Sequence, residues 1–114
     1  MGRDGWHFVS DVVELTLSRR VPVRFDVMAQ TAFPLARRGR LARAVRQDLW
    51  RMLQGLRGFS PVVRVIRDVD HLCLQVGGGV EGRFPRGHVE AQLAQMLADP
   101  MHRARWIAYA GGAA

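Results

Sequence analysis

Apolar and polar residues alternate over residues 21–29, VPVRFDVMA, in the way typical of a strand. One face of this stretch would carry only apolar side chains, those of Val21, Val23, Phe25, Val27 and Ala29. Because successive side chains of a strand point to opposite faces, the pattern predicts a strand with one buried face. Pro22 has no backbone N–H, which places it at the start of this strand or on a sheet edge.

The preceding segment, residues 11–17, has an ambiguous pattern. It is compatible with a partner strand, joined to the next by a turn at residues 18–20, or with a short helix. Its content of β-branched residues favours the strand.

A helical pattern follows over residues 35–56. With 3.6 residues per turn, one face of this helix would be apolar, carrying Leu41, Val45, Leu49, Met52, Leu53 and Leu56. Pro34 suits the first turn, and Gly58 is a suitable stop signal. Gly39 disfavours helix and moves the expected regular start toward Arg40.

The second half of the chain begins with a predicted three-stranded meander. Residues 62–67 and 72–76 form a hairpin around a turn at 68–71, and glycines 77–79 provide a second turn. Residues 80–84 are the expected third strand.

Two helices are predicted to close the chain, over residues 88–98 and 100–109. The inward face of the first would carry Val89, Leu93, Met96 and Leu97. Asp99 and Pro100 match the N-cap and first position of the second helix.

This order of elements predicts an α+β fold: an antiparallel sheet with the helices packed on one of its faces. The 114 residues fit a single domain spanning residues 1–114. We expect flexible ends at about residues 1–5 and 110–114.

The composition excludes several classes of protein. No apolar run approaches the roughly 20 residues of a membrane-spanning helix, so no membrane partner is expected. The first residues lack the apolar stretch of a secretory signal. A single cysteine, Cys73, cannot form an intramolecular disulfide and, between two leucines, is expected to be a small buried residue. A cytoplasmic protein is therefore predicted.

The net charge of +7 is concentrated in one segment. Residues 37–67 hold nine arginines and one acid, whereas residues 1–36 are neutral and residues 68–114 carry −1. All 17 basic residues are arginine, and asparagine is also absent, which indicates a GC-rich genome rather than a requirement for guanidinium groups. The uneven distribution of charge favours a polyanionic partner.

The predicted long helix supplies the candidate binding residues. The side away from the apolar stripe carries Arg40, Arg43, Arg46, Arg51 and Arg57, and Trp50 falls between Arg43 and Arg46 in angle. The candidate binding residues are Arg40, Arg43, Arg46, Trp50 and Arg57. A tryptophan among arginines can stack on a nucleic-acid base, or it can anchor a protein partner. The alternative is that the C-terminal helix, with Trp106 and Ile107, covers Trp50.

Two short motifs favour a structural role. Gly77, Gly79 and Gly82 have the spacing of a dinucleotide-binding loop, but such a loop opens a helix, whereas this segment looks extended. The glycines are therefore assigned to a hairpin turn or a bulge. Asp70 and His71 belong to a predicted turn and match no metal-ligand spacing.

These patterns predict a non-enzymatic binding domain with no catalytic residue, metal or cofactor. The first hypothesis is RNA or DNA binding through the arginine-rich helix. The alternative is a protein-interaction module, an adaptor or a homo-oligomer, that uses Trp50 and the surrounding arginines. A small enzyme ranks last, because it would require a pocket lined by residues such as Asp70, His71 and Cys73.

Overall fold

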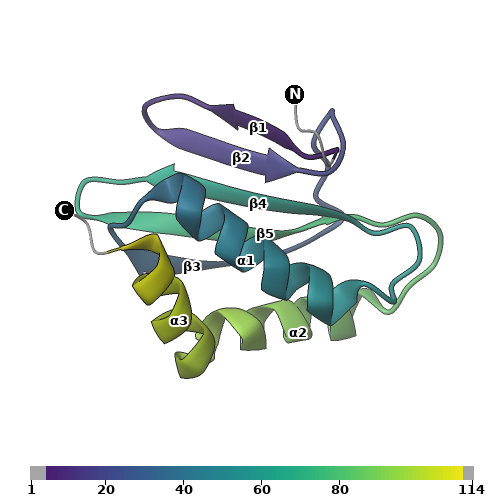
Figure 1. Cartoon of the computed structure of the whole chain (residues 1–114). Helices are drawn as coiled ribbons and strands as arrows, with labels where there is room; N and C mark the ends of the chain where they lie inside the picture. The colour runs from purple at the N-terminus through teal and green to yellow at the C-terminus, as the bar shows by residue number, and fades with distance from the viewer. Residues whose placement is uncertain (1–4, 112–114) are drawn as a thin grey trace.

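A computed structural model describes residues 5–111 as a five-stranded antiparallel sheet with three helices (Figure 1). The strands are β1 (His7–Ser10), β2 (Glu14–Ser18), β3 (Val27–Pro34), β4 (Ser60–Arg67) and β5 (His71–Gly79). Their order in the sheet is β1-β2-β4-β5-β3. The helices are α1 (Arg38–Leu53), α2 (Arg86–Ala98) and α3 (Pro100–Ala110). The predicted α+β class is confirmed. The predicted flexible ends fall mainly outside the described residues.

The core lies between the sheet and the helices. Val63 of β4 is in register with Leu17 of β2 and with Val76 of β5, so three apolar side chains line up across the sheet. Helix α1 packs against β2 and β4, whereas α2 packs mainly against β3. The predicted stripe of α1 contributes four buried side chains, those of Leu41, Val45, Leu49 and Leu53. Its other two members, Met52 and Leu56, are partly buried against the core.

The strand predicted at residues 21–29 is displaced along the chain. Strand β3 begins only at Val27, and Val21 is 61% exposed in the loop before it. This loop is held in place by contacts distant in sequence: Arg24 donates to Glu81 Oε2 at 3.1 Å, and Asp26 accepts from the N–H of Val80 at 2.8 Å. Arg24 and Asp26, which match the solvent face of the predicted strand, therefore anchor a loop.

The second strand was correctly favoured over a helix, but its partners differ from those expected. Strand β2 pairs with β1 and β4, whereas β3 pairs with β5 at the opposite side of the sheet. Residues 18–20 therefore do not form a hairpin turn between β2 and β3.

The three consecutive glycines lie inside β5 and do not form a turn. A Cβ on Gly77 would lie 2.0 Å from the carbonyl oxygen of Val27, and one on Gly78 would lie 2.0 Å from that of Ser60. Both residues also have a positive φ. These glycines therefore allow β3 and β4 to approach β5 closely. The predicted third meander strand at residues 80–84 is an irregular connection to α2.

Local sequence signals predicted the helix ends with mixed success. Pro34 is the last residue of β3, opposite His71, so α1 starts later than its proline suggested. In α2 the four predicted inward residues are all buried. The side chain of Asp99 accepts from the N–H of Met101 at 2.9 Å, which confirms the predicted N-cap of α3. Within residues 5–111, no helix is long and apolar enough to cross a membrane.

Candidate functional site

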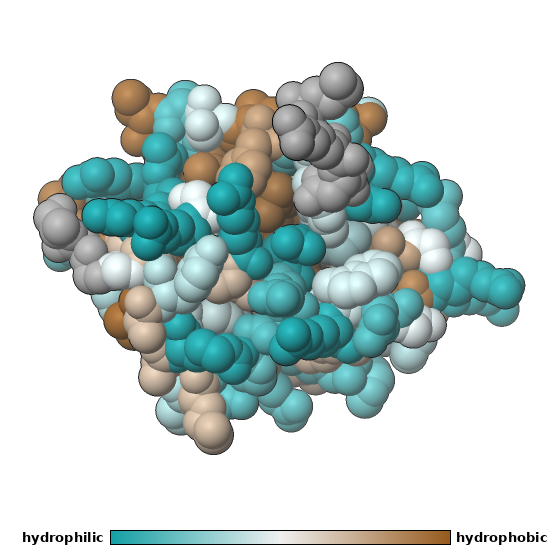
Figure 2. Space-filling model, in the orientation of Figure 1, coloured by the Kyte–Doolittle hydropathy of each residue, from teal (hydrophilic) through white to brown (hydrophobic). Residues whose placement is uncertain are grey.

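The side of α1 that faces away from the sheet is flanked by the β1–β2 hairpin and by α3, and a hollow lies along each flank. Figure 1 shows α1 crossing the sheet between the β1–β2 hairpin and α3. On this face of the molecule, hydrophilic side chains gather over α1, and apolar ones gather over the hairpin (Figure 2). Arginines from α1 line the hollows on both sides.

We call the hollow on the hairpin side the aromatic groove. It has a volume of about 450 Å³ and is lined by Trp6, Arg19, Arg20, Arg46, Trp50, Phe59, Ser60 and Pro61. The Arg46 guanidinium lies 4.8 Å from the centre of the Trp6 ring, and that of Arg19 lies 5.5 Å from the same ring. A guanidinium held against an aromatic ring keeps its charge while its position is restricted.

We call the hollow between α1 and α3 the interhelical groove. Its volume is about 390 Å³, and its lining residues are Arg43, Ala44, Arg46, Gln47, Asp48, Arg51, Arg105, Trp106 and Tyr109. Arg43 also stacks on Phe8 at 5.0 Å on the hairpin side of the helix. Arg43 and Arg46 therefore connect the surfaces on the two flanks of α1.

The carboxylate of Asp48 is already engaged inside the interhelical groove. Its Oδ2 accepts from Trp106 Nε1 at 2.7 Å and from an Arg105 Nη2 at 2.6 Å, and its side chain is only 10% exposed. Arg105 thus offsets the charge of Asp48. Within the described part of the chain, neither Arg43 nor Arg46 pairs with a carboxylate, so their charges remain available to a ligand.

The structure brings together three of the five predicted site residues. Arg46 and Trp50 line the aromatic groove, and Arg43 and Arg46 line the interhelical groove. Arg40 is exposed on α1 but lines neither groove. Arg57 lies beyond the end of α1, in the exposed connection to β4.

Trp50 is not covered by the C-terminal helix. Trp106 is fully buried, with its ring 6.4 Å from that of Phe33, and Ile107 is itself partly exposed. Trp50 stays 43% exposed at the edge of the aromatic groove. The alternative in which α3 shields this side chain is therefore wrong.

Several lining residues escaped sequence reasoning because only the fold brings them to α1. They are Trp6, Arg19, Arg20, Phe59, Arg105 and Tyr109. They come from the residue before β1, from the loop after β2, from the connection before β4 and from α3. The adjacent pair Arg19–Arg20 was the one visible signal, and nothing in the sequence linked it to a helix that begins only at Arg38.

The opposite face of the sheet holds a different arrangement of polar groups. Arg64 donates to Thr16 Oγ1 at 3.2 Å, lies 3.4 Å from Glu14 Oε2 and stacks on Phe25 at 5.2 Å. These contacts tie β4 to β2 and to the loop before β3. Arg64 therefore does not extend the basic surface around α1.

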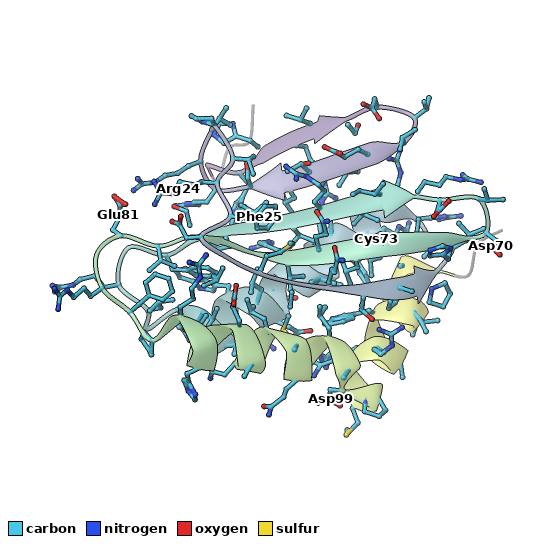
Figure 3. All side chains as sticks on the ribbon, turned by 180° about the vertical axis from the view of Figure 1, so that it is seen from behind. Arg24, Phe25, Asp70, Cys73, Glu81 and Asp99 are labelled. Atoms are coloured by element: carbon cyan, nitrogen blue, oxygen red, sulfur yellow. The ribbon has the colours of Figure 1, made fainter. Side chains whose placement is uncertain are left out.

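The residues considered for an enzyme or a metal site lie apart from both grooves. Figure 3 shows Asp70 at the β4–β5 turn and Cys73 farther along β5. Asp70 Oδ1 lies 2.9 Å from His71 Nδ1 and raises the pKa of the His71 ring. Cys73 is half-buried on the face opposite Leu72 and Leu74, so the prediction of a core position is wrong. Among residues 5–111, no group of three or more potential metal ligands is clustered.

The chain matches no protein-family model, and no match is found among curated proteins or solved structures.

Proposed function

We propose that this chain is a non-enzymatic domain that binds nucleic acid on the surface around α1. The observation that carries the proposal is the convergence of six arginines from three segments along the two adjoining grooves: Arg19, Arg20, Arg43, Arg46, Arg51 and Arg105. Guanidinium groups match phosphate oxygens in shape and charge. The one acid among the lining residues, Asp48, is already bound by Arg105, so this pair carries no net charge and the other five arginines supply the positive charge of the two grooves.

The length of the basic surface suits a chain of phosphates better than a single anion. Arg43 and Arg51 are eight residues apart on α1, a distance of about 12 Å along the helix axis. A nucleic-acid strand carries one phosphate per nucleotide along its whole length. A strand lying along α1 would therefore present more than one phosphate to this surface.

Fluorescence anisotropy with labelled mixed-sequence RNA and DNA tests this proposal at low salt. The test protein carries Arg43→Ala and Arg46→Ala, and the charge-matched control carries Arg67→Ala and Arg83→Ala. The control arginines are exposed and line neither groove. We expect the first pair to weaken binding strongly and the second pair to have little effect. Equal losses in the two proteins would contradict a binding surface on α1.

A protein partner is the second candidate, and exposed apolar residues favour it. Val9, Val12 and Val13 on the β1–β2 hairpin are exposed, with Val12 87% accessible, and β1 is an edge strand. Apolar groups grouped on one surface mark interaction sites, and unpaired edge strands can accept another chain. Sedimentation velocity over a range of concentrations would detect self-association, and loss of association in a Val9→Thr/Val12→Thr variant would locate it. A concentration-independent monomer would exclude the homo-oligomer.

A further inference from the structure

We infer that the nucleic acid is single-stranded and that the aromatic groove accepts an unpaired base against Trp50. This inference rests on the proposed function, because it assigns the form of nucleic acid bound on the same surface. It depends on the aromatic composition of the groove, on the state of each ring in it, and on the position of α1 within the fold.

The aromatic groove gathers three aromatic side chains from separate parts of the chain. Trp6 precedes β1, Trp50 belongs to the last turn of α1, and Phe59 precedes β4. Purely phosphate-binding surfaces need only cations and polar groups. Aromatic rings interleaved with arginines are typical of sites that bind unpaired nucleotides, since every base has a flat face that can stack on a ring.

The two tryptophans of the aromatic groove differ in whether other side chains already stack on their rings. The Trp6 ring already carries the guanidiniums of Arg46 and Arg19. Trp50 has no such ring contact among the described residues, and 43% of it is exposed. Exposure of so large a ring to water is unfavourable, and stacking by a base would remove that exposure. Trp50 is therefore the stacking surface, and Arg46 beside it is placed to contact the adjoining phosphate.

The position of α1 disfavours a duplex ligand. A helix that reads duplex DNA projects into the major groove, and its side chains reach the base edges there. Helix α1 instead lies against the sheet between the hairpin and α3 (Figure 1). Its Arg46 lines the hollows on both flanks of the helix. The bases of a duplex are stacked inside it and cannot enter such a hollow, whereas an unpaired base can turn into it.

Three labelled ligands of equal length distinguish binding to unpaired bases, to the backbone alone and to a duplex. They are oligothymidylate, an abasic deoxyribose-phosphate strand and duplex DNA. Their binding is measured by anisotropy with the wild-type chain and with Trp50→Ala, and Trp50→Phe serves as the control that keeps a ring. We expect oligothymidylate to bind tighter than the abasic strand. Trp50→Ala should weaken oligothymidylate binding about tenfold or more. The same change should leave the abasic strand unaffected, and Trp50→Phe should retain most of the affinity.

The outcomes separate this inference from the proposed function. Equal binding of all three ligands, or an unchanged oligothymidylate affinity in Trp50→Ala, would overturn the base site while nucleic-acid binding stood. Preference for the duplex would also overturn it. Failure of every ligand to bind at low salt would reject the proposed function, and the base site with it.

Discussion

Replacing Asp48 by alanine tests how α1 and α3 are held together. The Asp48 carboxylate accepts one hydrogen bond from the indole N–H of Trp106 and one from the guanidinium of Arg105. Trp106 is fully buried, whereas 55% of the Arg105 side chain is accessible. In Asp48→Ala the indole N–H of this fully buried residue would lose its acceptor.

The magnitude follows from these two exposures. A buried donor left without an acceptor costs about 1–3 kcal/mol. The half-exposed arginine adds at most about 1 kcal/mol, because water screens the pair. We therefore expect Asp48→Ala to lower the free energy of unfolding by about 1–4 kcal/mol. In a chain of 114 residues this corresponds to a fall in Tm of roughly 5–15 °C.

Urea unfolding followed by tryptophan fluorescence measures this loss. The midpoint should fall while the dependence of stability on urea stays unchanged, as expected for a two-state transition. Asp48→Asn keeps an acceptor for the indole and should lose less. Arg105→Ala leaves the Trp106 bond intact and should cost below about 1 kcal/mol. If Asp48→Ala were no more destabilising than Arg105→Ala, the bond to Trp106 would not be a significant source of stability.

Three further predictions concern the sheet and its loops. Gly78→Ala should be strongly destabilising in thermal unfolding, because its Cβ would meet the Ser60 carbonyl oxygen, whereas Gly87→Ala, with open space around it, should be neutral or stabilising. The pKa of Asp26 is lowered from its usual 3.8 by a backbone N–H and by an arginine, so its contribution to stability is present above pH 4 and is lost as the pH falls further. The stability gap between wild type and Asp26→Asn should therefore close in acid urea titrations. The pKa of His71 is raised above 6.5 by the adjacent aspartate, so its contribution is present below that pH and is lost as the pH rises through the folded pKa. An NMR titration should show this pKa fall when the neighbouring aspartate becomes asparagine.

Helical periodicity gave the most reliable predictions because it records burial directly. The inward residues of α2 recur every three or four positions, and all of them pack into the core. The same reasoning found the buried stripe of α1. The N-cap at Asp99 was also predictable, because a cap depends on two or three adjacent residues only.

Alternation located strands less well because it does not identify where pairing begins. The alternating pattern runs through residues 21–29, yet only the part from Val27 onward pairs with β5. The preceding loop is fixed by Arg24 and Asp26, whose partners lie more than fifty residues away. Gly77 and Gly78 were predicted to form a turn. In the sequence, glycines that allow two strands to approach closely cannot be distinguished from glycines of a turn.

Only part of the candidate site could be predicted from the sequence, because some of its residues come from segments that are far apart along the chain. Arg43, Arg46 and Trp50 share one helix, so their spacing predicted their proximity. Trp6 and Arg19 reach that helix through the pairing of β1, β2 and β4, which is a property of the whole sheet. Proximity of this kind cannot be predicted from spacing along the chain.

The salt dependence of oligonucleotide binding tests the central claim most directly. The logarithm of the association constant is plotted against the logarithm of salt concentration for the wild type, for Arg43→Ala/Arg46→Ala and for Arg67→Ala/Arg83→Ala. Each phosphate contact with a single strand contributes about 0.7 to the slope, so loss of Arg43 and Arg46 should reduce its magnitude by about 1.4. The control pair should leave the slope unchanged. A wild-type slope near zero, or one that the loss of Arg43 and Arg46 does not alter, would contradict phosphate binding on this surface.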